Sequence, residues 1–484
     1  MSLASLIRVL LPKNHFARSV SVLAGGTAGG QAILVLAAPV LTRLYTPEDF
    51  GVFAIFAAML AILGVLASLR YQLAIPLPGL DEDADQVLVL SLLVVVVMAV
   101  VAAVAVLLFR EHASVALGIP SLASYLWLLP IGLLFVGSHQ VGVYWAVRVK
   151  SFPVLAKVSI TQSLATVGVQ LAGFSLGPLA LILGQVFGQA LGSASLLIRA
   201  IGSRMHLLAR VTLTDILKAA KRYRRLPLYS TWAGLFNAAS HQLPAVFFAV
   251  LFSPSAAGLY LVAHRVLAMP LNMVGGAIAH VFFSKASEAH RNDALAPLVA
   301  DVHDKLAHIG MPVALILVFA GPSLFSWVFG ESWREAGQFA QWMAPWLYLM
   351  FVSSPLSTLF FVTETHGQEL FFQALLLAAR LLALLVGAIH GDLLFAVALF
   401  AVASALCYLY LLVWIFRRSG NALASAFHSV AGAMIWGLLV SLPLLVGLII
   451  DTSDILWFSA ILLASVLTVS RYAFLARKFR LYSE

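Results

Sequence analysis

The stretch Ala256–Glu288, AAGLYLVAHRVLAMPLNMVGGAIAHVFFSKASE, is an apolar run long enough to cross a membrane, and it carries an arginine near its middle. Arg265 lies about ten residues from the start of the run, which is roughly 15 Å along a helix and close to the centre of a hydrocarbon core about 30 Å thick. A guanidinium at that depth costs about 2.5–3.5 kcal/mol on insertion scales, so we expect it to face a watery cavity or an anionic partner. The alternative is that Arg265 donates hydrogen bonds to backbone carbonyls in a packed interface.

The composition of the whole chain indicates a polytopic membrane protein. Of the 484 residues, 62% are hydrophobic and only 10% are charged, a balance that soluble globular domains do not show. The single cysteine, Cys407, lies in an apolar run, which excludes a disulfide framework and a cysteine-based zinc site. In a membrane protein, the net charge of +9 is first a question of which side of the bilayer carries the basic residues, and it does not by itself indicate nucleic-acid binding.

Apolar runs of about twenty residues predict an all-α fold with about fourteen transmembrane helices. With the N-terminus in the cytoplasm, 23 of the 29 Lys and Arg residues fall on the cytoplasmic side and three fall outside, as the positive-inside rule requires. This topology also places the C-terminus in the cytoplasm. The predicted spans are Val20–Leu41, Phe50–Leu69, Val87–Phe109, Ala123–Val147, Val154–Phe174, Leu179–Ile198, Tyr229–Leu251, Ala256–Phe283, Leu306–Val328, Phe339–Val362, Leu370–Ile389, Leu393–Phe416, Ala426–Ile450 and Ile455–Phe474.

An internal repeat divides the first twelve spans into two halves. Leu44–Phe53 aligns with Leu251–Tyr260, with proline and glycine at matching places, and both stretches join the first span of a half to its second. Two halves with the same orientation are parallel repeats, an architecture that favours alternating access by rocking of one lobe against the other. We therefore predict a six-helix lobe at 1–198, a basic cytoplasmic linker at 199–228, a second six-helix lobe at 229–418, and two extra helices with a tail at 419–484.

Two sets of residues resemble the motifs of a known transporter family. Leu66–Pro76, LASLRYQLAIP, closes the second span, and Gly258-Leu259-Tyr260 with Ala263–Leu267 opens the eighth. Both are similar to motifs of the polysaccharide (O-antigen and exopolysaccharide) flippases of the multidrug/oligosaccharidyl-lipid/polysaccharide exporter superfamily. One position departs from that resemblance, because a glutamate is expected where Gln72 stands, close to Arg70.

The resemblance implies two lobes around a central cavity and transport of a polyprenyl-pyrophosphate-linked oligosaccharide. The direction implied is from the inner to the outer leaflet of a bacterial inner membrane. Membrane lipids, and a glycan polymerase and glycosyltransferases of the same pathway, are the implied partners. We expect no catalytic residue, no metal, no cofactor and no nucleic-acid partner.

The residues themselves suit a lipid-linked sugar diphosphate. The planar fork of arginine matches phosphate oxygens, and Arg265, Arg70 and Arg18 are the candidate cations. Arg380, in the eleventh span, either extends this path or forms an interhelical bond. Polar side chains at similar depth are candidate glycan contacts or members of a buried hydrogen-bond network. These are Asn237 and His241, which share a helix face, with Gln242 and His264.

Other functions remain as alternatives. A peptidoglycan lipid-precursor flippase and a multidrug exporter of the same superfamily are the nearest, whereas a membrane-embedded glycan polymerase or ligase is the enzyme alternative. Asp81-Glu82-Asp83 has the spacing of a metal-binding DxD motif, but it falls in a short cytoplasmic loop, where a solvated acidic turn is expected. We therefore interpret the chain as a transporter rather than an enzyme.

Overall fold

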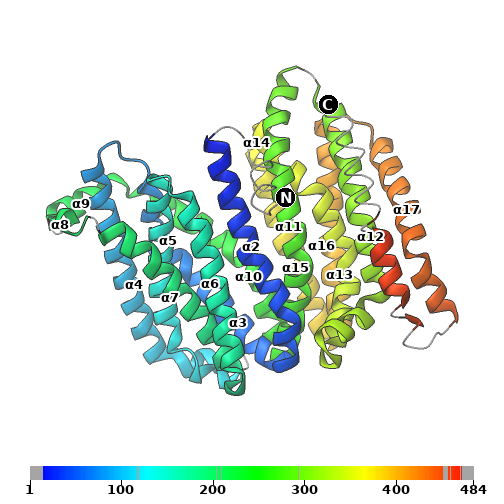
Figure 1. The fold of residues 1–484 in the computed structure, drawn as a ribbon, viewed down its shortest axis with the longest axis horizontal. Coiled ribbons are helices and arrows are strands. Elements are labelled where there is room, and N and C mark those ends of the chain that lie inside the picture. Colours follow the sequence, from blue (N-terminus) through cyan, green and yellow to red (C-terminus); the bar gives the residue numbers. More distant parts are fainter. Residues whose placement is uncertain are drawn as a thin grey trace, which may run out of the picture. The chain divides into compact units, whose positions relative to one another are not determined.

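The computed structural model describes residues 15–116, 119–202, 204–208, 210–292, 294–450, 456–457, 459–468 and 470 of the chain. Throughout these residues the chain forms helices and short connections and no strand. Thirteen of the described helical stretches are long and apolar enough to cross a membrane, and Figure 1 shows the helices in chain order. The predicted all-α, multi-pass membrane fold is confirmed.

The fourteenth predicted span, Ile455–Phe474, is described only in part. A shorter apolar helix covers Ser459–Thr468, and much of the remaining stretch lies outside the described residues. Most of the other helices begin and end within a few residues of the predicted bounds or run past them. The predicted span Phe339–Val362 is instead broken, because α13 (Arg334–Ser353) is followed by a 3₁₀ turn and the short α14 (Leu359–Val362). Helix α4 (Asp81–Ala116) and helix α12 (Leu295–Phe329) extend furthest beyond the apolar runs that predicted them.

Contacts divide the chain into two compact units, Met1–Gly258 and Leu259–Glu484, which we call unit 1 and unit 2. This division differs from the predicted boundary at 199–228, because helix α10 (Thr231–Leu251) packs on α3 (Pro47–Leu66) and so belongs to unit 1. The basic segment also packs within unit 1, where α9 (Leu213–Arg222) contacts α4. The two six-helix lobes therefore stay a prediction.

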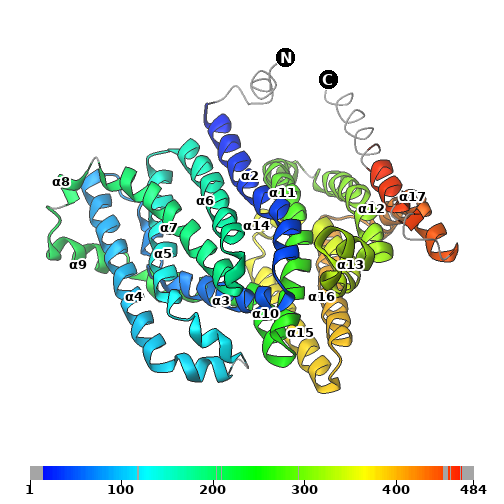
Figure 2. The same ribbon diagram turned by 60° about the horizontal axis from the view of Figure 1, so that its bottom comes forward.

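In unit 1, helices α4 to α7 lie side by side (Figures 1 and 2). Helix α4 contacts α5, α5 contacts α7, α7 contacts α6, and α6 contacts α2. Figure 2 shows α8 and α9 near one end of α4. The further helices of this unit are α2 (His15–Leu44), α5 (Leu128–Arg148), α6 (Phe152–Ala172), α7 (Pro178–Gly202) and the short α8 (Met205–Leu208).

Unit 2 is organised around α12 and α13. Helix α12 packs on α13 and on α17, α13 packs on α16, and α16 packs on α15. Bulky aromatic side chains fill this core, among them Trp333, Trp346 and Phe400, each buried almost completely. The helices of this unit are α11 (Pro254–Arg291, which begins in unit 1), α13 (Arg334–Ser353), α14 (Leu359–Val362), α15 (His366–His390), α16 (Leu393–Arg418) and α17 (Leu423–Ile450).

Glycine faces allow close helix contact in unit 1. The GxxxGxxxG spacing of Gly184, Gly188 and Gly192 predicts such a face, and the structure confirms it, because the backbone at each glycine lies against α6 side chains such as Gln162, Thr166 and Gln170. The GxxxG spacing of Gly25 and Gly29 on α2 also predicts such a face, but the closest contacts lie one position further along, and a β-carbon at Gly29 would make only an ordinary contact with Ile160 at 3.7 Å. A β-carbon at Gly25 would meet nothing within 4 Å. The close contacts are instead made by Gly26 with Ala156 and by Gly30 with Ser159 on α6.

The two copies of the repeat contact each other. A β-carbon on Gly51 would collide with the carbonyl oxygen of Pro254, and a β-carbon on Gly258 would collide with the carbonyl oxygen of Pro47. The helix starts are also built alike: Thr46 accepts a hydrogen bond from the Asp49 amide at 3.2 Å, and Ser253 accepts one from the Ala256 amide at 3.1 Å. The matching prolines and glycines therefore form one reciprocal contact between the starts of α3 and α11.

Candidate functional site

Arg70 lies in an unusual turn after the end of α3. Leu69 and Arg70 both adopt left-handed backbone conformations, with φ of 47° and 65°. Positive φ is uncommon for residues other than glycine, and two in succession must be held in place by the surrounding structure. The chain then continues as a 3₁₀ helix over Tyr71–Ala74.

The Arg70 guanidinium lies against the backbone of Gly234 on α10. A β-carbon at Gly234 would lie only 2.7 Å from Arg70 Cζ and 2.8 Å from Nε. The Nε atom is buried and has no hydrogen-bond partner, and the guanidinium forms no ion pair with any residue that the structure describes. An unsatisfied buried donor on a charged group is costly, so a hydrogen-bond acceptor at this guanidinium would be stabilising.

Two further predicted residues share the helix face on which Arg70 rests. Asn237 and His241 follow Gly234 by three and seven positions, and residues at these spacings lie on the same side of a helix. Both side chains are exposed, and Gln242 is half-buried. The structure thus brings Arg70, Asn237 and His241 to one accessible face of α10. We call this set the α10 face.

Gln72 is turned away from Arg70. It is 1% exposed and lies in a chain of side-chain hydrogen bonds, in which Ser68 donates to Gln72 and the Gln72 amide donates to Gln140 Oε1 at 3.1 Å. Gln140 in turn donates to the carbonyl oxygen of Gly64 at 3.2 Å. The residue at the position where a glutamate is expected therefore joins α3 to α5 and leaves Arg70 unpaired.

Arg265 lies on α11 within Pro254–Gly276, a stretch long and apolar enough to cross a membrane, and its depth in the bilayer stays a prediction. Its side chain is half-buried and forms no ion pair or hydrogen bond with another described residue. The next two residues, Val266 and Leu267, line an apolar cavity of about 280 Å³ between α11, α12 and α13. The buried Tyr348 hydroxyl, also without a partner, belongs to this lining.

His264 and Arg380 belong to an aromatic cluster in unit 2. His264 stacks on Tyr260 and on Trp346, with ring centroids 5.5 and 6.1 Å apart. Arg380 lies over the rings of Trp346 and Phe400, at 5.0 and 5.2 Å, and its Nε donates to Ser404 Oγ at 2.9 Å. Arg380 is only 8% exposed. Its geometry matches the interhelical alternative, while its role in substrate binding stays a prediction.

Arg18 is the remaining predicted site residue. Its backbone belongs to α2, but its side chain lies outside the described residues. Its predicted role at the start of the first span stays a prediction.

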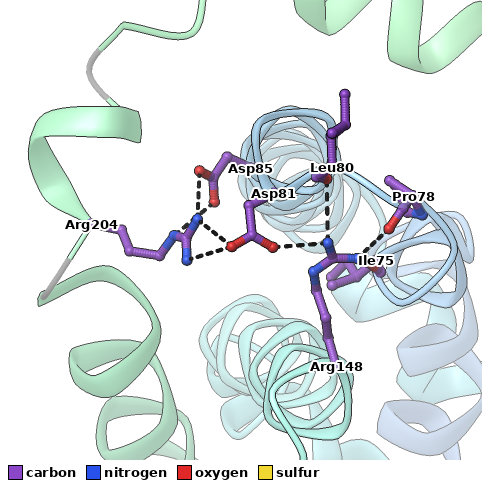
Figure 3. Close-up of polar contacts among 7 residues, drawn as sticks. All are labelled: Ile75, Pro78, Leu80, Asp81, Asp85, Arg148 and Arg204. Carbon is purple, nitrogen blue, oxygen red and sulfur yellow. Dashed lines mark hydrogen bonds and ion pairs between the residues drawn. The ribbon is translucent and has the colours of Figure 1, made fainter.

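A network of ion pairs at the start of α4 was not predicted from the sequence. Asp81 is exposed, as expected for a solvated acidic turn, and it also lies between Arg148, at 2.9 Å, and Arg204, at 3.3 Å (Figure 3). Arg204 also contacts the buried carboxylate of Asp85 at 3.1 Å. Arg148 completes the turn by donating to the carbonyl oxygens of Ile75, Pro78 and Leu80.

The carboxylates also determine the protonation of Arg204, which lies outside the spans. Burial alone would lower the pKa of Arg204, but its hydrogen bonds and charge interactions with Asp85 and Asp81 outweigh burial and raise that pKa above its ordinary value. Arg222 adds an exposed pair with Asp83 at 3.2 Å. The acidic run at the start of α4 thus anchors the basic segment that follows α7. The sequence signal is the complementary charge of the two segments.

Comparison with known proteins identifies the family. A sequence model of the family described as polysaccharide biosynthesis protein matches residues 40–338. No curated protein sequence matches the chain. Among solved structures, the lipid II flippase MurJ in an inward closed conformation is similar in fold with a TM-score of 0.73 at 12% identity, covering 94% of this chain and 99% of that one.

Two other solved structures share the fold. An inward-facing multidrug resistance MATE transporter of the MOP (multidrug/oligosaccharidyl-lipid/polysaccharide) superfamily matches with a TM-score of 0.58 at 14% identity, over 86% of this chain and 98% of that one. A MOP transporter from Pyrococcus furiosus matches with a TM-score of 0.54 at 15% identity, over 83% and 96%. At these identities the likeness concerns the fold, whereas the sequence match covers more than half of the chain. The chain therefore belongs to the polysaccharide biosynthesis protein family, and it shares the fold of these solved transporters.

Proposed function

We propose that this protein moves a polyprenyl-pyrophosphate-linked oligosaccharide from the inner to the outer leaflet of a bacterial inner membrane by alternating access. The observation that carries the proposal is the Arg70 guanidinium, which rests on Gly234 and whose buried Nε has no hydrogen-bond partner among the described residues. A diphosphate offers oxygen acceptors in the planar spacing that a guanidinium fork matches. Arg70 binds this diphosphate in the proposed mechanism.

The other polar groups of the α10 face suit the sugars. Asn237 and His241 are exposed on the same side of the helix and carry both donors and acceptors, as hydroxyl groups of a glycan require. Arg265 supplies a second cation, at the depth of the membrane centre. In the proposed cycle it stabilises the anionic head group during the crossing.

Two alternative cargoes follow from the related structures. One solved structure of similar fold is named as a lipid II flippase, and others are named as multidrug transporters. A peptidoglycan precursor also carries a lipid-linked diphosphate, so Arg70 would suit it equally. A cationic drug would be repelled by Arg70 and Arg265, and we therefore regard the lipid diphosphates as the better candidates.

Translocation in proteoliposomes tests the proposal. We expect Arg70→Ala and Arg265→Ala to abolish most flipping of a defined polyprenyl-diphosphate oligosaccharide, and the corresponding lysine variants to retain part of it, because charge survives without the fork. Gly234→Ala should also lower the rate, since its β-carbon displaces the Arg70 guanidinium without altering any charge. Arg222→Ala, which removes an exposed arginine, is the control and should leave flipping unchanged.

The cargo is tested in the same vesicles. Lipid II and a cationic dye, each supplied alone, replace the oligosaccharide. Faster movement of lipid II would assign the protein to peptidoglycan synthesis, and movement of the dye alone would favour an exporter. Full flipping by Arg70→Ala together with Arg265→Ala would refute the proposed role of these cations.

A further inference from the structure

A second basic site lies on unit 1 between α6 and α7. These neighbouring helices are antiparallel and joined by a short connection, and their packed face uses the glycines of α7 described above. At one end of the pair they border an open cavity of about 450 Å³, at which Lys157 and Arg199 are exposed. Its lining includes Val154, Lys157 and Thr161 from α6, with Leu191, Ser195 and Arg199 from α7.

The charge of this cavity is of one sign. Lys157 and Arg199 both line it, and neither forms an ion pair or hydrogen bond within the described part of the chain. The sequence from Ser151 to Gly202 contains no aspartate or glutamate. Two cations that share a cavity repel each other, so an anion between them would be stabilising.

Hydroxyl groups complete the polar part of the lining. Thr161 donates to the carbonyl oxygen of Val158 at 3.1 Å, and Ser195 donates to that of Leu191 at 2.8 Å. Rotation of either hydroxyl directs its donor to a bound oxyanion at the loss of one local hydrogen bond. The cavity therefore offers an ammonium, a guanidinium and two hydroxyl donors to the same ligand.

The depth of the cavity fits a lipid head group. Lys157 follows the start of α6 by five residues, roughly 8 Å at 1.5 Å per residue, and Arg199 lies in the last turn of α7. The predicted topology places this end at the cytoplasmic side. Long basic side chains at such depth reach toward the phosphate level of the bilayer.

The surface above the cavity is apolar and accessible. Leu164 on α6 and Phe187 on α7 are 55% and 52% exposed, and Leu191, which also lines the cavity, is 38% exposed. In a multi-pass protein, exposed apolar side chains of this kind face the acyl chains. A ligand with a phosphate in the cavity would continue naturally into hydrocarbon along this surface.

We propose that Lys157 and Arg199 bind the phosphate of an anionic phospholipid from the cytoplasmic leaflet, with its acyl chains along the outer surface of α6 and α7. This lipid is retained rather than transported, and the site is separate from the α10 face. The inference is independent of the cargo proposed above, since it concerns only the local chemistry of the α6–α7 pair.

Lipid binding to the full-length protein tests this site. The protein is placed in phosphatidylcholine nanodiscs, phosphatidylglycerol is titrated in, and retained lipids are counted by native mass spectrometry. We expect the wild type to retain phosphatidylglycerol in preference to phosphatidylcholine. Lys157→Gln with Arg199→Gln should weaken that retention about tenfold or more, as loss of two close charge contacts implies. Lys157→Arg with Arg199→Lys should preserve it.

Matched controls separate this site from general basicity. Arg224→Gln with Lys285→Gln removes the same charge from exposed positions elsewhere and should leave retention unchanged. Inorganic phosphate alone should not compete, and the polyprenyl-diphosphate oligosaccharide should displace the lipid no better than a neutral lipid does. Equal retention by the Lys157/Arg199 glutamine variant and the wild type would refute the proposal, as would effective competition by either phosphate compound. Flipping assays on the same variant report separately on the proposed function.

Discussion

Arg380 in unit 2 and Arg70 in unit 1 are guanidinium groups with opposite surroundings. Arg380 is held by two aromatic rings and the Ser404 hydroxyl. Arg70 rests on a glycine, and its buried Nε has no hydrogen-bond partner in the part of the chain that the structure describes. This difference shows that an arginine in an apolar sequence is a candidate for binding an anionic ligand only if the fold leaves its hydrogen-bond donors unused. Packing of aromatic faces can satisfy such a charge without any carboxylate.

Arg204 is a third arginine to compare with Arg70 and Arg380, because carboxylates hold it. Its replacement is expected to have the largest effect on stability. Arg204→Ala leaves the Asp85 carboxylate, whose side chain is 4% exposed, without its partner. Breaking such a pair costs about 3–5 kcal/mol. We expect a clear fall in the apparent melting temperature in detergent, with loss of amide protection over α9. Asp85→Asn combined with Arg204→Gln should recover part of the loss, and an additive double variant would contradict direct pairing.

A smaller effect separates Arg380 from Arg70 directly. Arg380→Lys keeps a buried charge but loses the flat contact with Trp346 and Phe400, so we expect a loss of about 2 kcal/mol. Arg70→Lys has no such contacts to lose and should change stability by less than about 0.5 kcal/mol. Thermal unfolding of both variants in one detergent checks the comparison. If Arg70→Lys destabilised the protein more than Arg380→Lys does, the packing contacts of Arg70 would be the stronger ones and the comparison of the two arginines would be wrong.

The smallest effect is expected at the exposed end of the charge network. Arg222 and Asp83 have side chains that are 62% and 37% exposed, so water screens their interaction. A double-mutant cycle with Arg222→Ala and Asp83→Ala should give a coupling of about 0.2–1 kcal/mol that decreases in high salt. A coupling free energy as large as that of Arg204 and Asp85 would show that solvent exposure does not determine the strength of the ion pairs in this unit.

The sequence predicted the features that depend on local composition. Runs of about twenty apolar residues predicted the spans, whereas the central depth of Arg265 stays a prediction. The turn at Leu69 and Arg70 was not predictable, because ordinary residues adopt positive φ only when tertiary contacts require it. The same limit applies to Gly26 and Gly30, since the sequence does not determine by one residue which side of α2 meets α6.

Contacts between distant segments account for the other differences. Asp81 and Arg204 are far apart in the sequence, and their pairing depends on how the basic segment folds back onto α4. The opposite charges of the two segments are compatible with ion pairing. Exposed charged groups are just as often solvated without a partner, so the sequence alone does not predict the pairs. The sequence did not decide whether Arg380 binds substrate or forms an interhelical bond, because its contacts lie on the distant helices α13 and α16.

The reciprocal contact of Gly51 with Pro254 and of Gly258 with Pro47 has an evolutionary consequence. A methyl group added to either glycine presses on the backbone of the other copy, where no side-chain rotation can make room. Each half therefore limits which substitutions the other can accept at this point. After a duplication, the sequences of the two motifs could diverge at most positions, whereas both glycines of this contact would have to be kept.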